Sequence, residues 1–179
     1  MSSERAGQRI AVFPHLPSET IETHGCWVVL RRVEGPEARE LFFSCQPPAD
    51  AVDAGQQAEA VYRAILGVLE AEAGSFGSVV CETLFLRSLR ADLEPIRAAR
   101  RRVLASCEGP SHRPATTKIE QPPLDEKNCL EISVQAVLPK RPPLRVDSFE
   151  ARPACGCAVC ARSHGLRVHV GEEARLGSP

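Results

Sequence analysis

The residues best suited to chemistry lie near the carboxyl end of the chain, in the segment CGCAVCARSH. It offers four potential ligands of the kinds that zinc prefers, Cys155, Cys157, Cys160 and His164. All four fall within a stretch shorter than the usual pair of zinc knuckles. The thiolates could equally bind an iron–sulfur cluster or copper, with His169 as a further ligand, or form a transient disulfide. Alternatively, the segment is an accessory tail whose cysteines bind nothing.

A second candidate is Glu131, which stands within the apolar stretch LEISV. A carboxylate is costly to bury without a partner, so this position favours a pocket or an interface over the core. The alternative is that Glu131 faces water at the edge of a sheet.

Composition narrows the classes of function. With 22 basic and 23 acidic residues the net charge is -1, and only 4% of residues are aromatic, so nucleic-acid binding and a ribonuclease activity are not expected. The first twenty residues lack the apolar core of a secretory signal, and no stretch approaches the ~20 apolar residues of a membrane span. We therefore expect a cytoplasmic protein whose eight cysteines are thiols or metal ligands rather than disulfides.

The strands and helices that the sequence pattern indicates would form an α+β domain at residues 22–140, and this domain must position the groups named above. An irregular arm at 1–21 precedes it, and a Pro-rich, Cys-containing tail at 141–179 follows it. The runs CWVVLRRV and ELFFSCQ predict two strands joined by a short turn. A helix follows, with Asp53 as its cap and Gly74 at its end, because apolar residues recur at helical spacing at Ala58, Val61, Ile65, Val68 and Leu69.

Beyond Gly74, the run SVVCETLFLR predicts a buried central strand, and Asp92 is expected to begin a second helix with Pro95 in its first turn. Two more strands are predicted in HRPATTKIEQPP and NCLEISVQAVLP. In the last of them, one face carries Leu130, Ile132, Val134 and Ala136.

Several short sequence motifs, in this order of elements, resemble those of the RidA family, also called YjgF or L-PSP endoribonuclease-like. FFSCQPP is similar to the family's S-G-Q-x-P, and Gln56 and Gln57 open the helix. AGSFGSVVCETLFLRSLRAD is similar to a-G-x-x-x-d-v-v-x-x-t-v-y-l-x-d, PATT to A-R-T-T, and LEISVQAVL to v-E-i-x-a-i-A. The similarity covers most of the predicted domain and preserves the order of its elements.

The resemblance implies a chorismate-mutase-like fold, with a mixed sheet and two helices packed on one face. It also implies a homotrimer with ligand pockets between subunits, and a domain that needs no cofactor. Members of the family deaminate reactive enamine and imine intermediates of amino-acid metabolism. The expected ligand is therefore a small carboxylate-bearing molecule.

In deaminating members an arginine grips the substrate carboxylate, and a glutamate on the last strand helps to hold the attacking water. By this resemblance Glu131 corresponds to the glutamate. Aligning Thr116 and Thr117 with the paired threonines places Ala115 where the arginine is expected. Cys45 stands in place of the glycine of S-G-Q, either as a reactive thiol or as a small packed residue.

Arg113 lies two residues before Ala115. On a strand it would share the face of Ala115, displaced by about 6.5–7 Å, and could replace the missing arginine. Alternatively, Arg113 ends a loop in solvent. The expected catalytic residues are Glu131, Arg113 and Thr117, and the expected pocket residues are Cys45, Ala115 and Thr116.

Two functions follow from these observations. The first is a RidA-like enzyme that deaminates an imine or enamine, or performs a related hydrolysis, for example of a chorismate-type ligand. The second is a non-catalytic ligand-binding or pathway-accessory module that has lost the family arginine and uses its tail for metal binding or protein contact.

The tail can be tested by elemental analysis of the full chain and of a chain that ends at Lys140. If the cysteine cluster binds zinc, the metal should be present in the full chain and absent from the shortened one, because all four ligands lie beyond Lys140. An identical metal content in both proteins would exclude a site in the tail.

Overall fold

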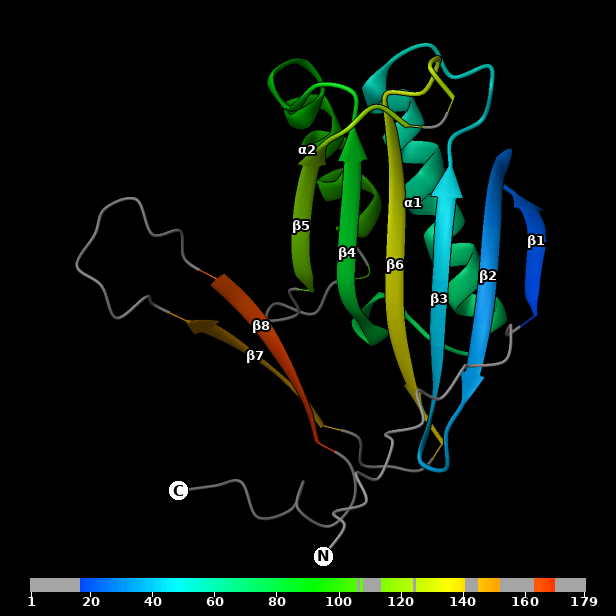
Figure 1. Cartoon of the computed structure of the whole chain (residues 1–179), viewed down its shortest axis with the longest axis vertical. Coiled ribbons are helices and arrows are strands. Elements are labelled where there is room, and N and C mark those ends of the chain that lie inside the picture. Colours follow the sequence, from blue (N-terminus) through cyan, green and yellow to red (C-terminus); the bar gives the residue numbers. More distant parts are fainter. Residues whose placement is uncertain are drawn as a thin grey trace, which may run out of the picture.

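Among the residues that the structure describes, a mixed sheet of six strands carries two helices on one face, and no helix covers its other face, called the open face below (Figure 1). The computed structural model describes residues 17–105, 107, 114–123, 125–140, 145–151 and 163–169. The strand order is β1-β2-β3-β6-β4-β5, in which β4 and β5 are parallel and all other neighbours are antiparallel. The predicted α+β class, with both helices on one face, is confirmed. No helix in these ranges is long and apolar enough to cross a lipid bilayer.

The six strands are β1 (Ser18–Thr23), β2 (Cys26–Glu34), β3 (Ala38–Gln46), β4 (Val79–Leu86), β5 (Ala115–Glu120) and β6 (Leu130–Pro139). The helices are α1 (Ala54–Ala71), α2 (Leu89–Leu104) and the short 3₁₀ turn η1 (Phe76–Ser78). In the tail, β7 (Arg145–Ala151) and β8 (Ser163–His169) form a separate antiparallel pair, which the sequence did not predict.

The first strand corrects the predicted boundary of the irregular arm. Strand β1 begins at Ser18, whereas the arm was expected to continue to residue 21. A tight turn joins β1 to β2 through His24 and Gly25, both with positive φ (51° and 72°). Only Ile21 of β1 packs against the core, so the strand shows almost no apolar alternation in the sequence.

Helix α1 begins as predicted, because the side chain of Asp53 accepts a hydrogen bond from the backbone N–H of Gln56 at 2.8 Å. Its end differs from the prediction. The left-handed residue that stops the helix is Ala73 (φ 58°), not Gly74. Gly74 instead leaves room for Leu138, whose side chain would lie only 3.0 Å from a Cβ at that position.

Helix α2 begins earlier than predicted. Its cap is Ser88, whose hydroxyl accepts from the N–H of Ala91 at 3.2 Å, and the helix starts at Leu89 rather than Asp92. Pro95 therefore lies inside the helix, beyond its first turn. The missing N–H of Pro95 leaves the carbonyl of Ala91 without its helical donor, a loss that the surrounding helix tolerates.

The core lies between the sheet and the two helices. Alternate residues of the strands enter it, as predicted for β6, where Leu130, Ile132, Val134 and Ala136 are all buried. Strand β4 departs from simple alternation because its pairing with β6 shifts between Val79 and Cys81. This bulge allows both Val79 and Glu82 to face the helices, and it leaves Cys81 and Thr83 on the open face.

A buried amide joins two loops at one end of the sheet. The side chain of Gln57, only 2% exposed, donates to the carbonyls of Ala51 (3.1 Å) and Lys127 (3.4 Å) and accepts from the N–H of Cys129 (2.7 Å). Gln57 thereby fixes the chain just before β6 against the start of α1. Because Cys129 is buried, its N–H depends on this partner most of the three.

The substitution Gln57→Met tests this role. It keeps the volume but removes three hydrogen bonds to backbone groups, so we expect the free energy of unfolding to fall by about 2–4 kcal/mol. Gln56→Met at the exposed neighbouring position should cost less than about 1 kcal/mol. Urea unfolding of both variants measures the difference, and equal losses would contradict the assigned role of Gln57.

Candidate functional site

The open face of the sheet carries side chains in three rows, because residues paired across neighbouring strands share a face. Each row crosses β2, β3, β6, β4 and β5 in that order. The glutamate row is Trp27, Gln46, Glu131, Phe85 and Ile119; the hydroxyl row is Val29, Ser44, Ser133, Thr83 and Thr117; the arginine row is Arg31, Phe42, Gln135, Cys81 and Ala115.

Glu131 lies at the centre of the glutamate row and is half-buried. Desolvation raises the pKa of its carboxyl group, and a hydrogen bond from the side chain of Gln46 on the neighbouring strand partly opposes that rise. Glu131 therefore retains a proton to a higher pH than an exposed glutamate does. A carboxyl group with a raised pKa accepts a proton more readily than an exposed glutamate does and can return it to a substrate.

A cavity of about 210 Å³ opens beside this carboxyl group. Phe85 of β4 and the segment that follows β5 line it, namely Gln121, Pro122 and Pro123. The segment is held to the sheet by a hydrogen bond from the N–H of Gln121 to the carbonyl of Leu86, at 2.9 Å. The carboxyl group of Glu131 therefore lies next to apolar aromatic and proline side chains as well as to the amide of Gln121.

Three of the residues predicted to form the site share the open face. They are Glu131, Thr117 and Ala115, one in each row. Strand β4 separates Glu131 from the other two, and ordinary strand spacing puts the Cα atoms of Glu131 and Thr117 about 12 Å apart. Within one chain these residues therefore share a surface without touching.

Two predicted pocket residues are corrected, because they lie on the face that the helices cover. The hydroxyl of Thr116 donates to the carboxylate of Glu82 at 3.2 Å, and Arg100 of α2 contacts the same carboxylate at 3.4 Å. Cys45 is fully buried, and burial raises its pKa far above the usual range for a thiol. Cys45 is thus a packed residue rather than a reactive thiol.

The remaining predictions concern segments that the structure describes incompletely. Arg113, Cys155, Cys157 and Cys160 lie outside the described residues, and for His164 only the backbone is described, on β8 opposite Glu150. Among the described residues, no group of three or more His, Cys, Asp or Glu side chains could hold a metal ion. The cysteines of these ranges are free thiols, namely Cys26, Cys45, Cys81, Cys107 and Cys129.

Sequence reasoning missed the partners of Glu131. Gln46 belongs to the motif FFSCQPP, but nothing in that motif shows that Gln46 lies opposite Glu131 in the sheet. Phe85 and Gln121 were assigned only to a strand and a turn. Their place beside the carboxyl group follows from strand pairing across long separations in the chain, which a single sequence does not reveal.

The raised pKa of Glu131 makes a prediction about stability. The folded protein holds the Glu131 proton to a higher pH than the unfolded chain does, so the contribution of Glu131 to stability falls as the pH rises through the folded pKa. Glu131→Gln removes this titration and should be more stable, relative to wild type, at pH 7 than at pH 4. Urea unfolding at both pH values measures the difference.

Glu70→Gln on the exposed surface of α1 is the control, and its effect should change little between the two pH values. A stability difference for Glu131→Gln that is the same at pH 4 and at pH 7 would show that the carboxyl group is not desolvated in the folded protein.

Comparisons with known proteins support the fold. No family model matches the chain, and no curated protein matches it in sequence. Among solved structures, it is similar to a protein from Salmonella typhimurium described as a candidate translation initiation inhibitor, with 20% identity and a TM-score of 0.55, over 69% of this chain and 99% of that one. It is also similar to the YjgF gene product of Escherichia coli, with 21% identity and a TM-score of 0.50, over 59% of this chain and 84% of that one.

These similarities extend over more than half of this chain and most of each neighbour, while the identity is low. They confirm the architecture that the resemblance to RidA and YjgF proteins implied, and they leave the reaction to be argued from the residues. The chain therefore has the YjgF-type fold.

Proposed function

We propose that this protein hydrolyses a small imine that bears a carboxylate, with Glu131 as the acid/base group. The observation that carries the proposal is a half-buried carboxyl group of raised pKa in the wall of a cavity. Such a group can bind a water molecule, accept a proton from it as it attacks, and return the proton to the leaving nitrogen.

The chemical step needs only water as the nucleophile and Glu131 as the acid/base group. Water adds to the carbon of the C=N bond, and the carbonyl product forms as ammonia leaves, so the imine and water become a ketone and ammonia. The cavity of about 210 Å³ is of a size for a metabolite of a few carbon atoms. Holding the imine and the water together supplies much of the rate enhancement.

Arg113 from a neighbouring copy of the chain, together with Thr117 of that copy, is the anchor for the substrate carboxylate in this proposal. Within one chain Thr117 lies about 12 Å from Glu131, and Arg113 would lie farther along the sheet. Support comes from strand alternation, because a residue two positions before Ala115 would continue the open face of β5. A guanidinium suits this task because its planar fork matches a carboxylate.

One observation favours a second candidate, a non-catalytic ligand-binding module. Within the described residues, the lining of the cavity beside Glu131 includes no cationic side chain, and Ala115 stands at the position of the family arginine. In that case the tail, with its proposed zinc ligands, would provide contact with another protein.

We also propose that the chain assembles as a homotrimer through the open face. Several large apolar side chains on this face are exposed in the single chain, and a second copy could cover them. They are Trp27 (54% exposed), Val29 (41%), Phe42 (39%) and Ile119 (37%).

Ammonia release from enzymatically generated 2-aminoacrylate, the enamine form of such an imine, tests the proposed reaction. Glu131→Gln should lower the rate by about 10²–10⁴-fold, the usual contribution of a general acid/base. Glu70→Gln should leave the rate unchanged. A wild-type protein that releases no ammonia above the uncatalysed rate would exclude the deaminase and favour the ligand-binding module.

Light scattering during size-exclusion chromatography tests the trimer. The wild type should have three times the mass of the single chain, and Trp27→Glu should dissociate it because a charge would be placed in the interface. Val52→Glu is the matched control, since Val52 is 86% exposed and lies in the loop before α1. A wild-type monomer, or a trimer that survives Trp27→Glu, would contradict the proposal.

A further inference from the structure

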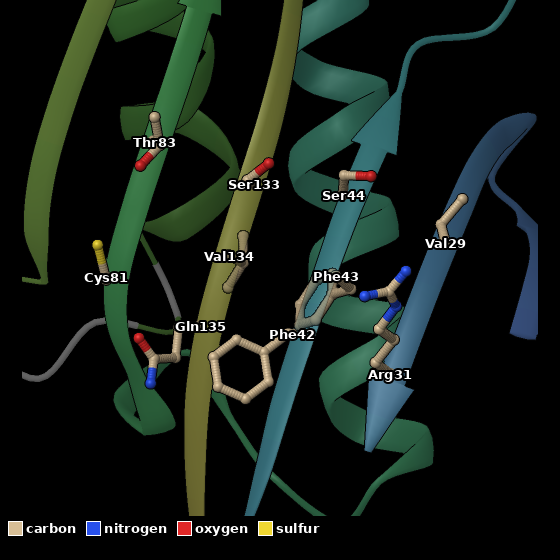
Figure 2. Close-up of a pocket in the computed structure, with 10 residues that line it drawn as sticks. All are labelled: Val29, Arg31, Phe42, Phe43, Ser44, Cys81, Thr83, Ser133, Val134 and Gln135. Carbon is tan, nitrogen blue, oxygen red and sulfur yellow. The ribbon is translucent and has the colours of Figure 1, made fainter. Parts of the chain in front are cut away.

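A second hollow of about 390 Å³ lies on the open face, over the hydroxyl and arginine rows (Figure 2). Its lining contains one formally charged side chain, Arg31 of β2, and no carboxylate. Figure 2 shows the guanidinium of Arg31 between β2 and β3, while the ring of Phe42 points from β3 toward β6 and Gln135. The hollow is therefore positively charged, and the carboxyl group of Glu131 is not part of it.

Arg31 has no acidic partner among the described residues. The salt bridges in these ranges engage arginines elsewhere, such as Arg32 and Arg39, on Glu72. By strand register the nearest acid on the same face is Glu40, and it instead accepts a hydrogen bond from the amide of Gln135 at 3.3 Å. In the single chain, no acid of the described residues engages the fork of Arg31, so the fork can bind an anion that reaches this face, including one enclosed there in the proposed trimer.

Hydroxyl groups from three adjacent strands complete the hollow. Ser44 of β3, Ser133 of β6 and Thr83 of β4 are half-buried, and in the described part of the chain none of these hydroxyls takes part in a hydrogen bond with protein. Neighbouring strands lie about 4.8 Å apart, so two such hydroxyls can donate to different oxygens of one anion.

The hollow is distinct from the cavity beside Glu131. Arg31 and Glu131 are separated by two strands and two rows, which ordinary sheet spacing converts to about 17 Å between their Cα atoms. Neither cavity is lined by both residues. An anion bound at Arg31 therefore does not stand at the position of the imine in the proposed reaction.

We propose that this hollow is a binding site for a small oxyanion, a carboxylate or a phosphate. The guanidinium of Arg31 provides charge and two parallel N–H donors, and the hydroxyls of Ser44, Ser133 and Thr83 provide further donors. Phe42 forms an apolar wall that limits competition from water.

Isothermal titration calorimetry at low ionic strength, with inorganic phosphate in one arm and acetate in the other, tests the site. Wild type should bind at least one of the two saturably. Arg31→Gln should weaken binding at least tenfold, and Ser133→Ala about threefold to tenfold. Arg31→Lys should recover only part of the affinity, because it restores the charge without the fork.

Arg90→Gln is the matched control, since Arg90 is exposed on α2 and has no salt bridge in the described ranges; its affinity should stay within twofold of wild type. Preference for phosphate or for acetate identifies the class of anion. Absence of saturable binding of either anion by wild type, or an equal loss in Arg31→Gln and Arg90→Gln, would overturn the proposal.

Two further variants distinguish loss of the anion site from misfolding of Arg31→Gln and from loss of the proposed deaminase activity. Far-UV circular dichroism checks that Arg31→Gln is folded; if it is not, the double variant Ser44→Ala, Ser133→Ala takes its place, and unchanged affinity there would overturn the site. Glu131→Gln should bind the anion as wild type does. Loss of deaminase activity and loss of anion binding are therefore distinguishable.

Discussion

Every functional argument for this protein depends on the register of its central strands. Because side chains alternate between the two faces of a sheet, a shift of one residue in the pairing of β3 with β6 would exchange the open face for the core. The observed register places Gln46 opposite Glu131 and groups the hydroxyls of three strands. The two helices enforce it, since only one phase of each strand offers them a continuous apolar surface.

The open face combines features that a sheet rarely exposes for stability alone. A desolvated carboxyl group, a guanidinium with no acidic partner in the described part of the chain, and large apolar side chains each cost free energy or invite a ligand or a second copy of the chain. The helix-covered face is different, because its buried acid Glu82 has partners within the chain: Thr116 and Arg100 both contact it. Stability and recognition are thus divided between the two faces of one sheet.

Local patterns sufficed to predict α1, the β2–β3 hairpin and the buried face of β6. The cap at Asp53 and the alternation from Leu130 to Ala136 are properties of short segments. Strand β1 was not predictable in this way, because its place in the sheet comes from pairing with β2 rather than from its own pattern. Thr116 and Cys45 were misplaced because the face of each residue depends on its alignment with distant strands, and the cavity beside Glu131 depends on three separate segments.

The bulge in β4 has a consequence for how such a chain can change during evolution. The bulge determines which face of the sheet each later residue of β4 occupies. Cys81, Thr83 and Phe85 reach the open face only because one residue is accommodated at the bulge without a partner on β6. If that residue paired with β6 instead, all three would turn inward and Glu82 would turn outward, whereas its deletion would leave their pairing with β6 unchanged. Loops elsewhere can lengthen or shorten gradually, whereas at this position a mutation preserves the surface only if any extra residue stays out of the ladder with β6.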